Sequence, residues 1–391
     1  MKTQTNPYLT TLTPLRGIAA LFVVIFHSSI FIGPFMADGY TSFFDNAWLW
    51  VDFFFILSGF IMCYAYNGYF KDKVTTTAYW KYIGARFARI YPLNFVTAIW
   101  AFIIACITLH LATRLDPFIA QIINPKALPA CLLLIQSMHI YDTPPLNTPS
   151  WSLSTEWWAY MLFPFIVPYF VKLKDTGRLV TGALAIAYYV FLKYVIGPVS
   201  QNPVPSINMV ADFGFLRCLA GFFAGMLTFS FYERRAGFAF IKNDWFFSLF
   251  FFGVMAALHF NVMDILIIAF FPFIIITAAY NNGVVKRILD NRVLQRLGDW
   301  SFSIYMVHMP IIASFTSFAV SKNPSMLADM HKFLSQKPNY AFGLIRCFVI
   351  VLLTLLIASL TYRFVEIPSR NYFNKLFNTR QKKITTETLE V

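Results

Sequence analysis

Near its N-terminus the chain has a long apolar stretch, PLRGIAALFVVIFHSSIFIG, at residues 14–33. About 20 apolar residues in a helix are needed to cross the ~30 Å hydrocarbon core of a bilayer, and this stretch has that length. Two ionisable side chains interrupt it, Arg16 and His27. The stretch therefore predicts a transmembrane helix with two energetically costly polar groups, which makes both of them functional candidates.

The composition of the whole chain agrees with this first helix. Of its 391 residues, 58% are hydrophobic and 13% are charged, whereas a soluble domain carries about 25% charged residues. This excludes a soluble enzyme, a disordered chain and a nucleic-acid binder. The apolar residues run in long blocks rather than alternating singly, which excludes a transmembrane β-barrel. We expect an all-α polytopic membrane protein in a lipid bilayer.

Further apolar blocks of membrane-spanning length follow along the chain. They lie at residues 47–66, 90–111, 151–171, 178–196, 212–231, 244–261, 264–281, 301–318 and 342–364. One more run, 128–140, is too short to span and has prolines nearby on both sides, so we expect a re-entrant or interfacial segment. The prediction is about ten transmembrane helices. No metal site is expected, because the cysteines lie in apolar segments without metal-ligand spacing.

The distribution of basic residues sets the expected orientation. The net charge is +13, and an excess of Lys and Arg marks the cytoplasmic loops of membrane proteins. With a cytoplasmic N-terminus, the large majority of the 31 Lys and Arg residues fall on the cytoplasmic side. We therefore expect both termini in the cytoplasm and a first helix that is retained rather than cleaved. The expected membrane domain covers residues 1–372 and the cytoplasmic tail covers 373–391.

Several ionisable residues are expected inside the membrane. Arg16 and His27 are eleven residues apart, close to three full helical turns, so both project from one helix face about 16 Å apart. Four residues come out at a similar depth in the outer half of the membrane: His27, Asp52, Glu156 and Arg217. We expect one shared site, and the alternative is a buried network that specifies helix pairing.

A second group of basic residues lies on the cytoplasmic side. Arg86 and Arg89 are one helical turn apart near Lys81, and planar guanidinium groups suit phosphate oxygens. Ordinary positive-inside charge or lipid headgroup binding is the alternative. His308 is expected to be too shallow to share the His27 site and to be a core histidine. Glu366 is expected to pair with a nearby arginine.

Six sequence blocks in this order resemble the acyltransferase family 3 membrane proteins. They are LTPLRGIAALFVVIFHS, VDFFFILSGFIM, ARFARIYP, PSWSLSTEWWAYMLFP, LGDWSFSIYMVHMP and EIPSR. Arginine, ten residues and histidine form the family's first motif, and Arg-x-x-Arg forms another. The resemblance covers roughly residues 10–372. It implies an O-acyltransferase of the O-antigen and exopolysaccharide acetylase type, here expected without a fused SGNH-type domain.

This resemblance also implies substrates and a location. The expected location is a bacterial cytoplasmic (inner) membrane, with acyl-CoA, most often acetyl-CoA, as the co-substrate and no tightly bound cofactor. The expected acceptor is a hydroxyl of a cell-surface glycan or glycolipid precursor, such as lipopolysaccharide or exopolysaccharide, on the outer side. A separate periplasmic partner enzyme is a further expectation, and no nucleic acid is expected.

Roles for the candidate residues follow from the resemblance and from their chemistry. Arg86, Arg89 and Lys81 would hold the phosphates of CoA, and its pantetheine arm would run along the Arg16 face. His27 would be the general base, in direct transfer rather than as an acyl-enzyme nucleophile. Asp52 or Glu156 would orient it. The candidates for binding the substrate or an oxyanion are Arg217, Trp151, Ser154, Tyr305 and His308.

Two other functions remain open at this stage. A proton-coupled transporter or flippase of a glycoconjugate could use the buried carboxylates and histidine as a proton relay. Neither inverted repeats nor matched broken helices are visible in the sequence, which argues against it. A non-catalytic sensor of acyl-CoA or lipid is the second alternative.

Overall fold

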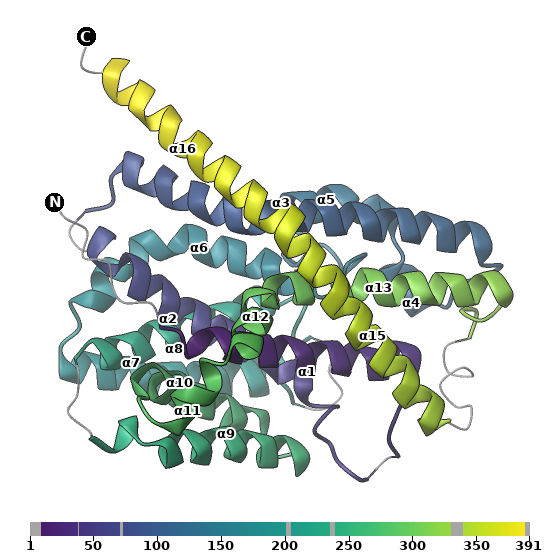
Figure 1. The fold of residues 1–391 in the computed structure, drawn as a ribbon, viewed down its shortest axis with the longest axis horizontal. Helices are drawn as coiled ribbons and strands as arrows, with labels where there is room; N and C mark the ends of the chain where they lie inside the picture. Colours follow the sequence, from purple (N-terminus) through teal and green to yellow (C-terminus); the bar gives the residue numbers. More distant parts are fainter. Residues whose placement is uncertain are drawn as a thin grey trace.

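The computed structural model describes residues 9–37, 39–70, 73–200, 205–234, 239–329 and 339–387, and in these residues it contains helices and no strand (Figure 1). The long helices are α1 (Leu12–Ile32), α2 (Trp50–Phe70), α3 (Thr76–Leu111), α6 (Ser150–Val171), α7 (Asp175–Phe191), α8 (Gly214–Glu233), α9 (Asp244–His259), α10 (Asp264–Tyr280), α13 (Ser301–Lys322), α15 (Tyr340–Thr361) and α16 (Ile367–Glu387). The predicted all-α class is confirmed.

Short elements connect the long helices. They are η1 (Ala47–Leu49), α4 (Pro117–Ile122), η2 (Pro125–Ala127), α5 (Leu128–Leu133), η3 (Leu192–Ile196), η4 (Ala239–Lys242), α11 (Val284–Leu289), α12 (Arg292–Asp299) and η5 (Tyr362–Glu366). Two of them continue a helix without a break, because η3 follows α7 and η5 joins α15 to α16.

Seven helices in the described residues are long and apolar enough to cross a membrane. They are α1, α2 with η1, α3, α7 with η3, α8, α13, and the α15–α16 rod. The other three predicted spans coincide with α6, α9 and α10. At 1.5 Å per residue, the 16 residues of α9 and the 17 residues of α10 are about 25 Å long, somewhat shorter than the hydrocarbon core. The count of ten spans and their orientation stay predictions.

Helix α3 corrects the expected boundary between a cytoplasmic segment and a span beginning at residue 90. The structure has one continuous helix from Thr76 to Leu111. Its start is fixed by Thr75, whose side chain accepts a hydrogen bond from the amide of Ala78 at 3.2 Å. The Arg-x-x-Arg element therefore lies on the same continuous helix as the span, and its side chains are directed by the packing of that helix.

The segment predicted to be re-entrant forms a short helix followed by irregular backbone. Helix α5 ends at Leu133, and the next residue, Leu134, caps it with a φ of 56°. The irregular stretch is held against the start of α6, where the amide of Gln136 donates to the carbonyl and the hydroxyl oxygen of Ser150, each at 3.1 Å. Such protein contacts are what non-helical backbone needs at membrane depth. Entry into the membrane stays a prediction.

Helices α2 and α8 pack more closely than any bulky residue would permit. A Cβ atom at Gly59 would lie 2.0 Å from the carbonyl oxygen of Phe222, and one at Gly225 would lie 1.9 Å from that of Ile56. Small residues of this kind allow helix backbones to approach in membranes. In Figure 1, these two helices and α1 lie at the centre, with α9 and α10 on one side and α3 on the other.

The end of the chain forms a long rod with α15 that crosses over α3 (Figure 1). Phe373 and Phe377 of α16 contact Phe87 of α3, with ring centroids 5.3 and 6.3 Å apart. Helix α16 runs through the expected domain boundary at residue 372 without a break. Its packing on α3 holds it beside the segment that carries the two arginines.

Candidate active site

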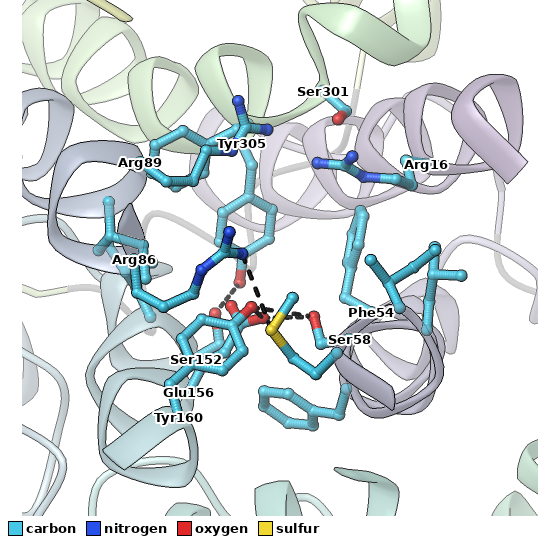
Figure 2. A pocket seen from close by; sticks show the side chains of 17 residues that line it. Arg16, Phe54, Ser58, Arg86, Arg89, Ser152, Glu156, Tyr160, Ser301 and Tyr305 are labelled. Carbon is cyan, nitrogen blue, oxygen red and sulfur yellow. Dashed lines mark hydrogen bonds between the residues drawn. The ribbon is translucent and has the colours of Figure 1, made fainter. Parts of the chain in front are cut away.

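A cavity of about 150 Å³ lies among α1, α2, α3, α6 and α13 (Figure 2). Its polar lining residues are Arg16, Ser58, Arg86, Arg89, Ser152, Glu156, Tyr160, Ser301 and Tyr305. Figure 2 shows Arg16 entering from α1 on one side and the arginines of α3 entering from the other. Residues far apart in the sequence thus place three guanidinium groups around one space, which we call the arginine pocket.

Arg86 is held by aromatic side chains rather than by a carboxylate. Its Nη2 donates to the hydroxyl of Tyr66 at 3.1 Å, and its guanidinium lies 5.4 and 5.9 Å from the ring centroids of Tyr66 and Tyr160. Within the described part of the chain, its buried Nε atom has no hydrogen-bond partner. A donor without a partner in a buried site is costly, so Arg86 has hydrogen-bonding capacity left for an anionic ligand.

Arg89 differs from Arg86 because its charge is compensated. It forms an ion pair with Glu366 of η5, and the hydroxyl of Ser303 donates to the same carboxylate at 3.1 Å. The guanidinium also lies 5.4 Å from the ring centroid of Phe302. The expected pairing of Glu366 with a nearby arginine is confirmed. Lys81 is exposed on α3 and does not line the arginine pocket.

Glu156 lies in this pocket and not beside His27. Its carboxylate accepts hydrogen bonds from the hydroxyls of Ser58 on α2 and Tyr160, one turn later on α6. Figure 2 shows these three side chains grouped below Arg86. Among the described residues no hydrogen bond joins Glu156 to His27, so the role of Glu156 in orienting His27 stays a prediction.

His27 instead lies beside His308 of α13. The Nδ1 atom of His27 is 3.2 Å from Nε2 of His308, and the ring centroids are 5.0 Å apart. His308 is completely buried, whereas His27 is partly exposed. The expectation that His308 is too shallow to reach His27 is wrong.

A close glycine contact between α1 and α12, the short helix that precedes α13, explains why the two histidines lie at one level. Gly17 of α1 packs against Gly298 at the end of α12, where an added Cβ would lie 2.7 Å from the Gly298 nitrogen. His27 and His308 each follow ten residues after these glycines. Helices α1 and α13 run side by side from this contact, so the two histidines arrive at the same level. A depth estimated by counting residues from the ends of the apolar blocks does not include this contact, so it placed His308 at a different level from His27.

The surrounding carbonyls assign the protons of the neutral histidine pair. Nδ1 of His27 lies 3.0 Å from the carbonyl oxygen of Val23, and Nδ1 of His308 lies 3.3 Å from that of Ile304. Carbonyls only accept, so each Nδ1 is placed to carry the proton. In that tautomer the single Nδ1–H of His27 is shared between the carbonyl of Val23 and Nε2 of His308. This assignment leaves the Nε2 lone pair of His27 available as a base.

Tyr305 connects the arginine pocket to the histidine pair. It lines the pocket, and its ring centroid lies 5.9 Å from that of His308. Its hydroxyl lies 2.7 Å from the hydroxyl of Ser152 and donates to the carbonyl of Pro149 at 3.1 Å. The side chain is thereby fixed between the two groups of polar residues.

The loop before α6 also holds the helix segment that bears His308. Pro310 has no amide hydrogen, so the carbonyl of Met306, four residues earlier, loses its usual helical partner. The side-chain amide of Asn147 donates to this carbonyl at 3.0 Å. Residues 147–149 thus fix α13 at two places near the histidine, through Met306 and Tyr305.

Asp52 and Arg217 form a separate, fully buried ion pair. Nε and Nη2 of Arg217 donate to the two carboxylate oxygens at 3.1 and 2.6 Å, and Nη1 donates to the carbonyl of Met209 at 3.3 Å. Trp48 and Trp151 lie on the guanidinium, with ring centroids 4.8 and 5.3 Å away. Nε, Nη1 and Nη2 of Arg217 each donate to an acceptor inside the protein. The guanidinium is therefore not placed to stabilise an oxyanion.

Asp52, Trp151 and Ser154 are likewise engaged in contacts inside the protein rather than placed for their expected roles. Asp52 is bound to Arg217 and does not orient His27. Trp151 is buried against Arg217 and offers no open stacking face. The hydroxyl of Ser154 donates to the carbonyl of Leu134 at 2.7 Å and is buried, so it holds the irregular stretch after α5. The four ionisable residues expected to share one site therefore belong to three separate groups: His27 with His308, Glu156 with its hydroxyl partners, and Asp52 with Arg217.

A family model described as an acyltransferase domain matches residues 12–363. The chain belongs to acyltransferase family 3. This confirms the resemblance seen in the sequence blocks. Family membership and the apolar helices of the chain together indicate a membrane O-acyltransferase. Both residues of the family's first motif lie on α1. Arg16 lines the arginine pocket, and His27 is one member of the histidine pair.

Two of the curated relatives of this family 3 chain carry acyltransferase names. It is 28% identical over 323 residues to acyltransferase MdmB of Streptomyces mycarofaciens, covering 78% of this chain and 79% of the relative. It is 23% identical over 402 residues to O-acetyltransferase OatA of Staphylococcus aureus, covering 96% of this chain and 59% of OatA. Protein 2 in the picA locus of Rhizobium radiobacter is 34% identical over 154 residues, covering 36% of this chain and 73% of that protein. No solved structure matches.

Sequence reasoning missed several residues that line the site of this family 3 acyltransferase. Ser58, Tyr160 and Ser152 contact the pocket carboxylate or Tyr305. The spacing of Glu156 and Tyr160, four residues apart on one helix, is a signal that could have predicted their contact. No comparable local signal exists for Ser58, which comes from a different helix.

Proposed function

We propose that this membrane O-acyltransferase takes its acyl group from acyl-CoA, bound in the arginine pocket, and transfers it to a hydroxyl at His27. One observation carries the proposal. Three arginines converge on one cavity, and Tyr305 connects that cavity to the histidine pair. A multiply charged donor and a base that activates an alcohol are the two requirements of this reaction, and the chain has a group for each.

The pocket arginines suit the phosphates of CoA. Among the described residues, Arg86 has an unused Nε donor and no carboxylate within hydrogen-bond reach, while Arg89 is paired with Glu366. Guanidinium forks bind phosphate oxygens in a bidentate manner that a lysine cannot match. We assign the larger share of phosphate binding to Arg86, with Arg16 completing the pocket from α1. The acyl end of the donor would extend past Tyr305.

The reaction can be written with the chain's own groups. Nε2 of His27 takes the proton of the acceptor hydroxyl while the hydroxyl oxygen attacks the thioester carbonyl carbon. The tetrahedral intermediate collapses, the C–S bond breaks, and the proton passes from His27 to the leaving sulfur to give free CoA. His308 Nε2 accepts the Nδ1–H of His27 throughout and favours the imidazolium that forms between these steps. The hydroxyls of Tyr305 and Ser152 are the proposed donors to the carbonyl oxygen, and each would exchange its present hydrogen bond for this one.

The acyl group, the acceptor and the membrane are further parts of the proposal. The name of OatA contains an acetyl group, which supports acetyl as the group transferred here. A hydroxyl of a cell-surface glycan or glycolipid precursor is the proposed acceptor, reached from the outer side of a bacterial inner membrane. A periplasmic partner enzyme remains a prediction that the described geometry does not require.

The test uses protein purified in detergent with radiolabelled acetyl-CoA and an extract of bacterial membrane lipids and glycans as the acceptor source. Release of CoA, with label appearing in the extract, is expected from wild type and from Arg292→Ala, which removes an exposed arginine on α12. Arg86→Ala and His27→Ala should lose this release. A glycoconjugate transporter would release no CoA, and a sensor would bind acetyl-CoA without turnover. Either result would refute the proposal.

A further inference from the structure

A second cavity, about 400 Å³ in volume, lies between α13 and α15. Its wall is largely aromatic and aliphatic, and includes Phe31, Phe315, Phe318, Phe342 and Ile345. Phe318, Phe342 and Ile345 are 66, 54 and 59% exposed, and on an apolar helix such surfaces face the lipid tails. If α13 and α15 span the bilayer as predicted, the cavity is open to the acyl chains of the lipids.

Phe31 places this cavity next to the histidine pair. It is one turn beyond His27 on α1, and the two rings stack with centroids 6.2 Å apart and an angle of 15° between them. Phe31 also lines a neighbouring apolar cavity that reaches α3 and α4. Apolar space thus lies on both sides of Phe31, within one helical turn of the proposed base.

One cation is present in the lining of this apolar space. Arg346, one and a half turns into α15, is the single charged residue among the described residues that line the cavity. Its Nε atom is buried, and the described part of the chain supplies no hydrogen-bond partner for it. The guanidinium lies 4.6 Å from the ring centroid of Phe342. An ionised group at membrane depth is costly, and this one lines the cavity with an unused donor.

We propose that this cavity binds a single-chain lipid phosphate whose headgroup carries the acceptor hydroxyl. The apolar chain lies between α13 and α15, the phosphate binds Arg346, and the attached hydroxyl reaches His27 past Phe31. The volume and the single guanidinium suit one chain and one phosphate better than a two-chain phospholipid. This inference rests on the proposed function, because it takes His27 as the reaction centre, and it adds the class of the acceptor.

A competing explanation for Arg346 comes from its position beside the end of α1. A Cβ atom at Gly33 would lie 3.2 Å from Nη2 of Arg346, and cations are favourable near helix C-termini. In that role the arginine would affect stability and show no preference for a phosphate. The two explanations therefore differ in one measurable quantity, the dependence of lipid affinity on the phosphate.

The experiment measures binding of radiolabelled decaprenyl phosphate and of decaprenol to the purified full-length protein in detergent. Wild type should bind decaprenyl phosphate at least about tenfold more tightly than decaprenol. Arg346→Ala should remove this difference, Arg346→Lys should keep part of it, and Arg114→Ala should keep all of it, because Arg114 is an exposed residue outside the cavity. Ala319→Phe, which fills the cavity, should weaken binding of both lipids.

Several results would overturn the inference. They are equal affinity for the two lipids, an unchanged preference in Arg346→Ala, equally tight binding of phosphatidylglycerol, or full competition by millimolar inorganic phosphate. Acetyl-CoA affinity of Arg346→Ala and Ala319→Phe, measured in the same preparations, should match wild type within about twofold. A wild-type protein that binds the lipid phosphate but turns over no acetyl-CoA would refute the proposed function and leave the lipid site standing.

Discussion

His308 Nε2 lies 3.2 Å from His27 Nδ1, and each ring has its Nδ1 atom near a main-chain carbonyl of its own helix. This relationship makes one histidine the hydrogen-bond acceptor of the other. It replaces the carboxylate that orients the base in a Ser-His-Asp triad with a neutral imidazole. A neutral partner avoids a permanent charge at membrane depth, where an unpaired carboxylate is expensive.

The first prediction concerns His308 as a positioning residue. His308→Ala should lower kcat for acetyl transfer about 10- to 100-fold and leave the KM for acetyl-CoA within about twofold, because the donor is held in the arginine pocket. His308→Gln keeps a hydrogen-bond acceptor and should recover part of kcat. An equal rise in KM for both variants, with kcat unchanged, would contradict the positioning role.

The second prediction concerns the contact that sets the register of the histidines. In Gly298→Ala, the new Cβ would lie 2.1 Å from the carbonyl oxygen of Thr13, so α1 and α12 must separate. Overpacking of this kind costs roughly 1–3 kcal/mol. We expect a lower melting temperature in detergent and a lower kcat. Gly68→Ala is the matched control, because nothing lies within 4 Å of its added Cβ. Wild-type kcat in Gly298→Ala would exclude the register argument.

The third prediction separates the two arginines of α3. Arg86→Ala should weaken acetyl-CoA binding by roughly 1.5–3 kcal/mol, which is about 10- to 150-fold, with little loss of stability. Arg89→Ala leaves the buried Glu366 without its cation, so its main effect should be on the melting temperature. Calorimetric CoA binding and thermal unfolding, measured on both variants, provide the comparison. Equal effects of the two substitutions on both quantities would mean that the arginines act as one unit.

The fourth prediction assigns a structural role to Asp52 and Arg217. Breaking a buried ion pair by removing one partner costs about 3–5 kcal/mol, so Asp52→Asn should lower the thermal stability of the purified protein strongly. The folded fraction should bind and turn over acetyl-CoA as wild type does. The double variant Asp52→Asn with Arg217→Met should recover part of the stability. Lost turnover in a fully stable Asp52→Asn protein would return this residue to the catalytic site.

The sequence was sufficient for the helix positions and for the membership of several site residues, but not for their partners. Periodicity and block length place α1, α2 and α13 correctly, because each must bury or span an apolar length by itself. The partner of His27 depends on the contact between Gly17 and Gly298, which no local pattern records. Glu156 was expected near His27 because both were counted from assumed membrane edges. Its contact with Tyr160 lies within one helix, but its contact with Ser58 comes from the packing of α2 against α6, which no local pattern records.

The central claim is that the arginine pocket binds the donor while His27 performs the proton transfer. The most direct measurement compares acetyl-CoA affinity and the rate of acetyl transfer in purified His27→Ala protein. The account predicts an affinity within about twofold of wild type and a rate lower by at least about 100-fold. A rate within about threefold of wild type, or a loss of acetyl-CoA affinity as large as the loss of rate, would contradict it.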